Sequence, residues 1–83
     1  MTYFVYLLQC DDGTLYTGIT TNLERRLKKH QNKLGGRYTR SRGAQKIVHS
    51  EEYPNKSTAL RREAEIKGWR REMKLALIEL IDK

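Results

Sequence analysis

The first twenty residues consist of two apolar stretches separated by a short polar break. Residues 2–10 are rich in tyrosine, phenylalanine, valine and leucine, which favours a strand. Asp11-Asp12-Gly13 is a turn signal, and residues 14–20 resume the strand-like pattern. The pattern therefore predicts a β-hairpin at the start of the chain.

The length of this turn decides which side chains share a face of the hairpin. A two-residue turn would point Tyr6 and Tyr16 to opposite faces, because strand side chains alternate. A three-residue loop with a left-handed glycine, a common hairpin connection, pairs Leu8 with Tyr16. It also pairs Tyr6 with Gly18, so that all four lie on one face and Gly18 leaves room beside Tyr6 for a ligand backbone. The alternative is that both tyrosines are ordinary half-buried strand aromatics.

A helix is predicted after the hairpin. Thr21 and Glu24 have the spacing of a capping box, in which Thr21 caps an amide of the first turn and Glu24 reaches back. The helix is expected to end near Gly35-Gly36, where a left-handed cap costs little. Its apolar positions recur with helical spacing, at Leu23, Leu27 and Leu34.

The second half of the chain reads as a loop, a strand and two helices. Residues 37–44 are predicted as a loop, and residues 45–53 as a third strand that ends at Pro54 and Asn55. A helix is expected from Ser57, as N-cap, to Lys67.

A break at Gly68 separates this helix from a last one over about residues 70–82. The predicted order is β-β-α-β-α-α. We therefore expect an α+β fold, a three-stranded antiparallel sheet flanked by helices, as one domain over residues 1–83.

Composition narrows the class of protein. Among the 83 residues there is a single cysteine, Cys10, which excludes an intramolecular disulfide and the usual cysteine-rich zinc cages. No apolar run approaches the roughly 20 residues that span a bilayer, and the N-terminus lacks the basic region of a signal peptide. We expect a cytoplasmic protein without a membrane partner.

Charge is concentrated in one segment. The net charge is +7, and the stretch from Arg25 to Ser50 holds nine Lys and Arg residues but no Asp or Glu. The rest of the chain is slightly acidic. Such a one-sided segment predicts a surface that follows phosphates, although a solvated basic surface is the alternative. The candidate nucleic-acid contacts are Arg25, Lys29, Lys33, Arg37, Arg40, Arg42 and Lys46.

Three further side chains have the chemistry of a phosphate site. Arg26 and His30 lie one helical turn apart, where Arg26 could clamp a phosphate and His30 could move a proton. Glu63 lies at or near the apolar face of its helix with Ala59 and Leu60, and a partly buried carboxylate needs a partner such as a cation. Each has an ordinary alternative: a solvated histidine, or a glutamate at the edge of an apolar stripe.

These elements together resemble the GIY-YIG nuclease family, over about residues 4–67. The resemblance is closest to the small single-domain members, and the same domain forms the incision module of the excision-repair protein UvrC. It implies that two tyrosines, a helix arginine and a glutamate line a phosphodiester-cleaving site. The matching residues are Phe4-Val5-Tyr6, Tyr16-Thr17-Gly18, Asn22-Leu23, Arg26, His30, Ala59-Leu60, Glu63 and Ile66-Lys67.

The resemblance also implies a role for each residue. Tyr6 and Tyr16 would position or deprotonate the attacking water, with Tyr6 as the first choice for the base. Arg26 would stabilise the pentacoordinate phosphate, and His30 would assist proton transfer. Glu63 would hold one Mg²⁺ or Mn²⁺ ion. The implied substrate is DNA, with RNA still open, cut in repair or processing by a monomer that DNA structure or a protein partner directs to its site.

Two departures from the family pattern keep another function open. The first motif is Phe-Val-Tyr rather than Gly-Ile-Tyr, which preserves the tyrosine. Many active members carry an asparagine after the glutamate, and this chain has none beyond Asn55. A nucleic-acid-binding module with little or no cleavage is therefore the second hypothesis, and a general interaction domain with a basic surface is the third.

Overall fold

The computed structural model describes residues 1–32 and 43–81, and this part of the chain has the predicted order β-β-α-β-α-α. The prediction of an α+β fold with a three-stranded antiparallel sheet is confirmed. The elements are β1 (Tyr3–Cys10), β2 (Leu15–Thr20), α1 (Leu23–Gln31), β3 (Ala44–Tyr53), α3 (Lys56–Lys67) and α4 (Arg71–Ile81).

The hairpin has the three-residue loop that places both tyrosines on one face. In the register of β1 and β2, Leu8 pairs with Tyr16, and Tyr6 pairs with Gly18, as predicted. Gly13 has φ of +84°, the left-handed conformation that this loop requires. Strand β1 is the central strand of the sheet and pairs with β2 along one edge and with β3 along the other.

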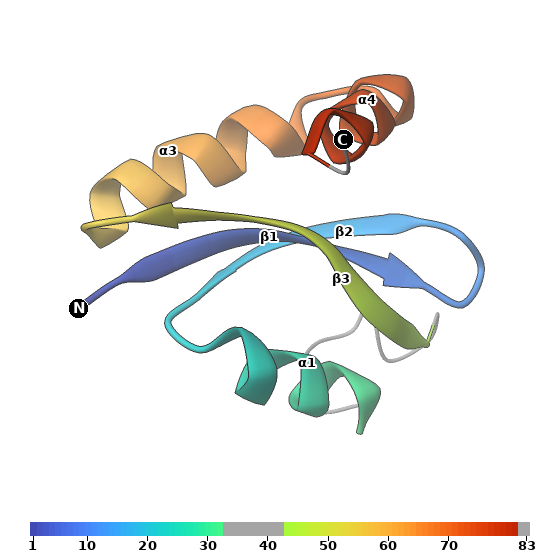
Figure 1. Cartoon of the computed structure of the whole chain (residues 1–83), viewed down its shortest axis with the longest axis horizontal. Coiled ribbons are helices and arrows are strands. Elements are labelled where there is room, and N and C mark those ends of the chain that lie inside the picture. Colours follow the sequence, from blue (N-terminus) through green and yellow to red (C-terminus); the bar gives the residue numbers. More distant parts are fainter. Residues whose placement is uncertain (33–42, 82–83) are drawn as a thin grey trace.

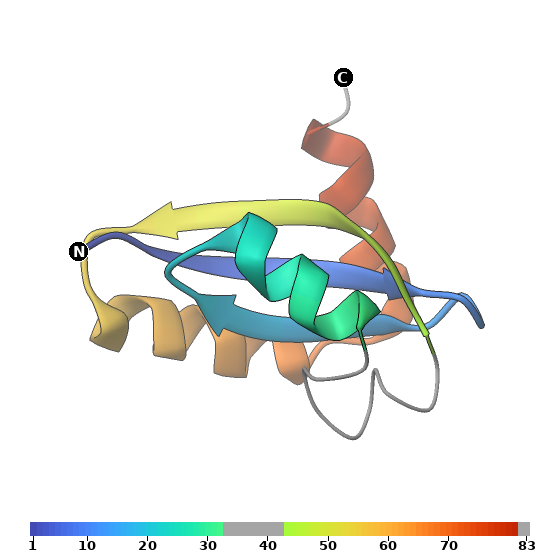
Figure 2. The ribbon, with the colours of Figure 1, turned by 90° about the horizontal axis from the view of Figure 1, so that it is seen from below.

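The two faces of the sheet are covered by different helices. Helix α1 lies on one face, and α3 and α4 lie on the other (Figures 1 and 2). The apolar core lies on the α3 side, where Val5 and Leu7 of β1 pack against Ala59 and Ile66 of α3. All four of these side chains are fully buried. Tyr6 and Leu8 point to the α1 side, because side chains alternate along β1.

Asparagines cap both α1 and α3, which corrects two predictions. Asn22, not Thr21, is the N-cap of α1, and its side-chain oxygen accepts a hydrogen bond from the Arg25 amide at 3.0 Å. Asn55, not Ser57, caps α3 by accepting from the Thr58 amide at 2.9 Å. An asparagine side chain supplies the same acceptor as serine or threonine, so a neighbouring asparagine can take the cap position.

The C-terminal end of α1 lies earlier than predicted. The helix ends at Gln31 and is capped by Asn32, whose amide donates to the carbonyl of Lys28 at 2.9 Å. The predicted Leu34 position and the Gly35-Gly36 stop lie outside the described residues.

The remaining connections tie the last helix to the hairpin. Gly68 forms the C-cap of α3, as its predicted helix-breaking role suggests, and α4 follows at Arg71. The Arg71 guanidinium donates to the carbonyl of Gly13 in the hairpin turn at 2.6 Å.

Within residues 1–32 and 43–81, no helix is long and apolar enough to span a bilayer.

Candidate functional site

Tyr6 is the centre of a buried polar cluster between the sheet and α1. Its side chain is fully buried, and so is nearly all of His30. The Tyr6 hydroxyl lies 2.9 Å from His30 Nε2 and accepts a hydrogen bond from Arg26 Nε at 3.3 Å. Arg26 and His30, one turn apart on α1, therefore both contact the same hydroxyl group, that of Tyr6.

The second tyrosine completes an aromatic group around this hydroxyl. The ring centroids of Tyr6 and Tyr16 are 6.2 Å apart, and those of Tyr16 and His30 are 5.2 Å apart in an edge-to-face arrangement. Tyr16 is partly exposed, as is Arg26, whereas Tyr6 and His30 are buried. The accessible part of the site is thus formed by Tyr16 and Arg26, with Tyr6 and His30 behind them.

Gly18 has a different role at the site from the one predicted. A Cβ atom added at Gly18 would lie 2.4 Å from the Tyr6 hydroxyl and 2.9 Å from the Tyr16 ring. The space left by the missing side chain is therefore filled by the two tyrosines and is not free for a ligand backbone. Glycine is needed here because the side chains of both tyrosines lie directly over the Gly18 backbone.

The environment of the cluster fixes where its protons lie. Burial, followed by the positive charge of Arg26, lowers the pKa of His30, so its imidazole is neutral at neutral pH. Burial raises the pKa of Tyr6 even though the hydrogen bond from Arg26 opposes the shift. Since Arg26 can only donate to the phenol oxygen, the Tyr6 hydroxyl proton is free to donate to His30 Nε2. Tyr6 is therefore a neutral phenol, not the phenolate that a simple tyrosine base would require.

Glu63 is the predicted site residue that lies on α3. Its side chain is 16% exposed, and its carboxylate lies 3.6 Å from Lys67 Nζ. Glu63 is one of the charges that raise the pKa of Tyr6, so its field reaches the phenol although α3 covers the other face of the sheet. Of the apolar face predicted for this helix, Ala59 and Ile66 are buried and Leu60 is 41% exposed.

The donors present suit a cation that keeps most of its water. No group of three or more His, Cys, Asp and Glu side chains in the described chain could hold a metal ion by itself. Glu63 supplies one partly buried carboxylate. Mg²⁺ is commonly bound by one or two carboxylates together with water and substrate phosphate, so this donor set fits a hydrated divalent ion.

The structure describes three of the seven predicted nucleic-acid contacts. Arg25 and Lys29 are exposed on α1, and Lys46 is exposed on β3. Lys28 adds another exposed cation on α1. The other four, Lys33, Arg37, Arg40 and Arg42, lie outside the described residues.

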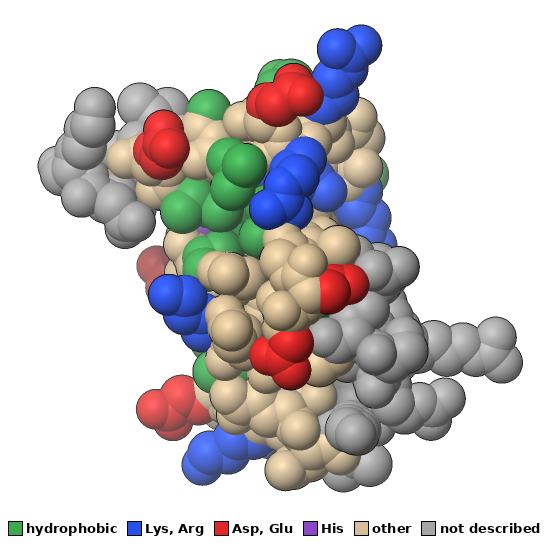
Figure 3. Space-filling view, turned by 90° about the vertical axis from the view of Figure 1, so that its right-hand side faces the viewer, with side chains coloured by type: hydrophobic (Ala, Val, Ile, Leu, Met, Phe, Trp, Pro, Cys, Tyr) green, Lys and Arg blue, Asp and Glu red, His purple; other side chains and the backbone are tan. Residues whose placement is uncertain are grey.

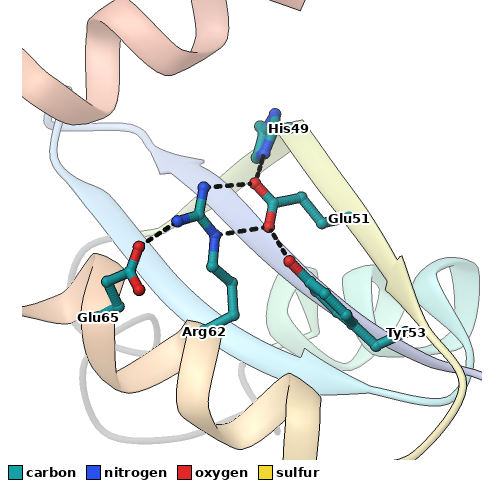
Figure 4. Close-up of polar contacts among 5 residues, drawn as sticks. All are labelled: His49, Glu51, Tyr53, Arg62 and Glu65. Carbon is teal, nitrogen blue, oxygen red and sulfur yellow. Dashed lines mark hydrogen bonds and ion pairs between the residues drawn. The ribbon is translucent and has the colours of Figure 1, made fainter.

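Sequence reasoning missed a second polar cluster, on the α3 side of the sheet. Glu51 of β3 binds Arg62 of α3, with His49 and Tyr53 beside it on the same strand (Figure 4). The signal was present in the alternation of polar side chains at residues 49, 51 and 53, which lie on one face of β3. The strand was predicted from its apolar residues alone.

Two hollows of the described surface lie away from the cluster around Tyr6. One, of about 350 Å³, is lined by Gln9, Lys46, Ile47, Val48 and Ile78, on the side where apolar side chains gather between α4 and the sheet (Figure 3). Another, of about 220 Å³, is lined by Thr2, Glu52, Tyr53 and Pro54. Neither contains a predicted catalytic residue, so we place the candidate site by its polar chemistry.

Known proteins are similar to this chain in sequence. Residues 2–76 match the family described as the GIY-YIG catalytic domain. A UPF0213 protein from Halalkalibacterium halodurans is 44% identical over 80 residues, which cover 96% of this chain and 85% of that protein. A UPF0213 protein from Clostridium perfringens is 51% identical over 75 residues, covering 90% of this chain and 81% of that protein.

Two solved structures are similar as well. The solution NMR structure of a UPF0213 protein from Bacillus halodurans has a TM-score of 0.62 at 44% identity and covers 96% of this chain and 85% of that one. A solution NMR structure of a protein from E. faecalis has a TM-score of 0.65 at 33% identity and covers 99% of this chain and 88% of that one.

Proposed function

Because the chain belongs to the GIY-YIG family of nuclease catalytic domains, we propose that it is a divalent-metal-dependent endonuclease that hydrolyses phosphodiester bonds in DNA. We further propose a role in DNA repair or processing. The observation that carries the proposal is the Tyr6 hydroxyl, held 2.9 Å from the neutral imidazole of His30 and 3.3 Å from the Arg26 guanidinium. A buried phenol between a proton acceptor and a cation is suited to acid–base chemistry next to a phosphate.

Arg26 is the group that meets the substrate first. It is partly exposed, and its hydrogen bond with Tyr6 raises its pKa, so it stays charged. Guanidinium groups bind phosphate oxygens in a forked geometry, which would stabilise the charge of the pentacoordinate transition state. At 3.3 Å its bond to Tyr6 is long, so a phosphate can draw Arg26 away from the phenol. This movement would open the Tyr6 oxygen to the attacking water.

The proton of the attacking water would then pass through Tyr6. The phenol oxygen accepts the water proton while the hydroxyl proton of Tyr6 moves to His30 Nε2. The water oxygen forms its bond to phosphorus as the bond to the leaving oxygen breaks. This sequence never requires a free phenolate, which the raised pKa of Tyr6 disfavours. Tyr16 would orient the water from the accessible side of the site.

Glu63 would hold the divalent ion, either Mg²⁺ or Mn²⁺. When bound, such an ion supplies Lewis-acid stabilisation of the scissile phosphate or the leaving oxygen. Glu63 is the acidic side chain whose charge reaches Tyr6, which supports this assignment. The exposed cations Arg25, Lys29 and Lys46 would follow the nucleic-acid backbone without reading its bases.

A cleavage assay tests the proposal. The purified protein is incubated with supercoiled plasmid, branched DNA and RNA in Mg²⁺ or Mn²⁺, beside Glu63→Ala and Tyr6→Phe. Tyr3→Phe, a partly buried tyrosine on the other face of β1, is the matched control. We expect wild type and Tyr3→Phe to nick DNA and the two site variants to lose this activity. Equal nicking by all four proteins would assign the activity to another centre or to a contaminant.

A nucleic-acid-binding module is the second candidate function. The absence of any asparagine after Asn55, where many active relatives carry one, favours it. In that case wild type would retard DNA in a gel without nicking it in either metal. Glu63→Ala would then bind at least as well as wild type, because it removes a negative charge near the phosphate path.

A further inference from the structure

The carboxylate of Glu51, on the face of the sheet opposite the phenol site, is fully satisfied by hydrogen bonds. Its Oε1 accepts from Arg62 Nε at 2.7 Å and from Tyr53 Oη at 2.6 Å. Its Oε2 accepts from Arg62 Nη2 at 3.1 Å and pairs with His49 Nε2 at 2.9 Å. The two Arg62 contacts form a bidentate fork, the most directional of the ion pairs in proteins.

Arg62 is held in place from its other sides as well. Its guanidinium lies 4.9 Å from the centroid of the Trp69 ring, and its Nη1 atom binds the Glu65 carboxylate (Figure 4). The side chain is 23% exposed, and that of Glu51 is 17% exposed. The pair therefore has far less freedom than a surface salt bridge.

Apolar packing alone defines the rotation of α3 poorly. Only Ala59 and Ile66 of this helix are buried, while Leu60 is 41% exposed. Two buried residues seven positions apart form a narrow contact line about which a helix can roll. The fork between Arg62 and Glu51 lies beside this line and is directional, so it removes that freedom.

The rotation of α3 decides where Glu63 points. Arg62 and Glu63 are adjacent, so their side chains leave the helix about 100° apart. With Arg62 fixed on β3, Glu63 is turned away from that strand, and its charge reaches Tyr6 on β1. A roll of about 20° would move a carboxylate at the rim of the helix by about 2 Å, given a helix radius of roughly 5–6 Å with side chains. A displacement of about 1 Å can cost a catalytic site on the order of 100-fold in rate.

We propose that the Arg62–Glu51 fork is the device that sets the rotation of α3 and thereby positions Glu63 at the cleavage site. Arg62 is a positioning residue and does not touch the substrate. The inference rests on the proposed function for its consequence in cleavage, but the rotation of the helix can be measured without metal or substrate.

The test compares Arg62→Lys with Arg61→Lys in the full chain. Arg62→Lys keeps the charge but loses the fork, and Arg61 is an exposed arginine on the same helix. Residual dipolar couplings of the α3 amides, fitted against those of β1 and β2, report the rotation of the helix. We expect a changed rotation in Arg62→Lys and wild-type couplings in Arg61→Lys. A folded Arg62→Lys with wild-type couplings would overturn the proposal.

A Mn²⁺ titration supplies the second measurement. Paramagnetic broadening of the Glu63 amide signal should need about tenfold more Mn²⁺ in Arg62→Lys than in wild type, as for other residues that orient metal ligands. The half-saturating Mn²⁺ concentration for nicking should rise by the same factor, while Arg61→Lys stays within about twofold of wild type. Unchanged Mn²⁺ dependence in a folded Arg62→Lys would contradict the positioning role.

The two proposals fail in different ways. If wild type shows no Mn²⁺ broadening near Glu63, the metal role of Glu63 is wrong, and the dipolar couplings alone decide the positioning role. If Arg62→Lys does not fold, Glu51→Gln replaces it. This variant removes the charge that the Arg62 fork binds, and a folded Glu51→Gln with unchanged helix rotation counts against the proposal.

Discussion

Each face of the sheet carries a polar cluster, and the two clusters differ in the charge of their central residue and in the lengths of its hydrogen bonds. On the α3 side, Glu51 is ionised and every contact it needs is present within a short distance. On the α1 side, the Tyr6 phenol is neutral, and its cationic donor lies at a long 3.3 Å. A charge whose hydrogen bonds are all made stabilises the fold. A neutral phenol between a proton acceptor and a weakly bound cation can exchange its proton and its partners. The comparison separates a cluster that holds the molecule together from one that can react.

The largest effect on the rate of nicking is expected when His30, the proposed proton acceptor, is replaced. We expect His30→Gln to lower the rate of nicking by about 10²–10⁴-fold, because glutamine cannot take the proton of Tyr6. The wild-type rate should fall as the pH drops through the pKa of His30, which burial and Arg26 place below 6.5. Nicking rates between pH 4.5 and 8 measure this limb. An acid limb that persists in His30→Gln would show that another group accepts the proton.

On the α3 face the corresponding change should act first on stability, and on cleavage only through the position of Glu63. Partial burial raises the pKa of Glu51, but hydrogen bonds from Arg62, Tyr53 and His49 outweigh it and hold the pKa at about 2, against an ordinary value of 4.5. A depressed pKa gives stability that is present above pH 4.5 and is lost as the pH falls toward 2. Wild type should therefore lose up to about 3 kcal/mol more unfolding free energy over this range than Glu51→Gln.

Urea unfolding at pH 6, 4 and 2.5 measures this loss. Glu52→Gln, on an exposed neighbour in the same strand, is the control and should follow wild type. Parallel pH dependences for wild type and Glu51→Gln would mean that the fork contributes no stability through the charge of Glu51.

Gly18 allows the reactive face to be perturbed without changing any polar group. Gly18→Ala would place a Cβ 2.4 Å from the Tyr6 hydroxyl, so we expect a loss of about 1–3 kcal/mol in stability together with reduced nicking. Gly68→Ala is the control, since its added Cβ would lie 3.5 Å from the nearest atom, an ordinary contact. Thermal unfolding and the NMR signals of Tyr6 follow both variants. A Gly18→Ala protein as stable and active as wild type would show that the two tyrosines can move freely.

The smallest effect should come from the exposed cations of the α1 side. Arg25→Ala and Lys29→Ala should each reduce the slope of log affinity against log salt by about one, if each contacts a phosphate. Lys56→Ala, at the start of α3, should leave the slope unchanged. Fluorescence anisotropy with a labelled duplex at several salt concentrations makes the measurement. Equal slopes for all variants would place the binding surface away from α1.

The features set by local geometry could be predicted from the sequence. The pairing of Tyr6 with Gly18 followed from the number of turn residues, and helix spacing placed Arg26 one turn from His30. Both rules depend only on neighbours along the chain. The predicted N-cap residues of the two helices were wrong although capping is also local, because Asn22 and Asn55 offer the same acceptor as the neighbouring threonine and serine.

Features that depend on packing between elements could not be predicted. Strand β3 has a register shift opposite Leu7 and Leu8, where Leu7 pairs with His49 but Leu8 pairs with Ile47. The extra residue, Val48, reverses which side chains face α3 from that point on, and no sequence pattern marks it. The raised pKa of Tyr6 depends on packing in the same way, since burial outweighs the hydrogen bond from Arg26 only in the folded protein.

The hairpin turn has a consequence for how this protein can change through evolution. The loop over residues 11–13 fixes which side of β2 looks toward α1. Inserting or deleting a single codon there would turn the whole strand over and send Tyr16 and Gly18 into the apolar layer beneath α3. Lineages that keep the two tyrosines on one face should therefore keep the length of this turn, or change it by two residues at a time.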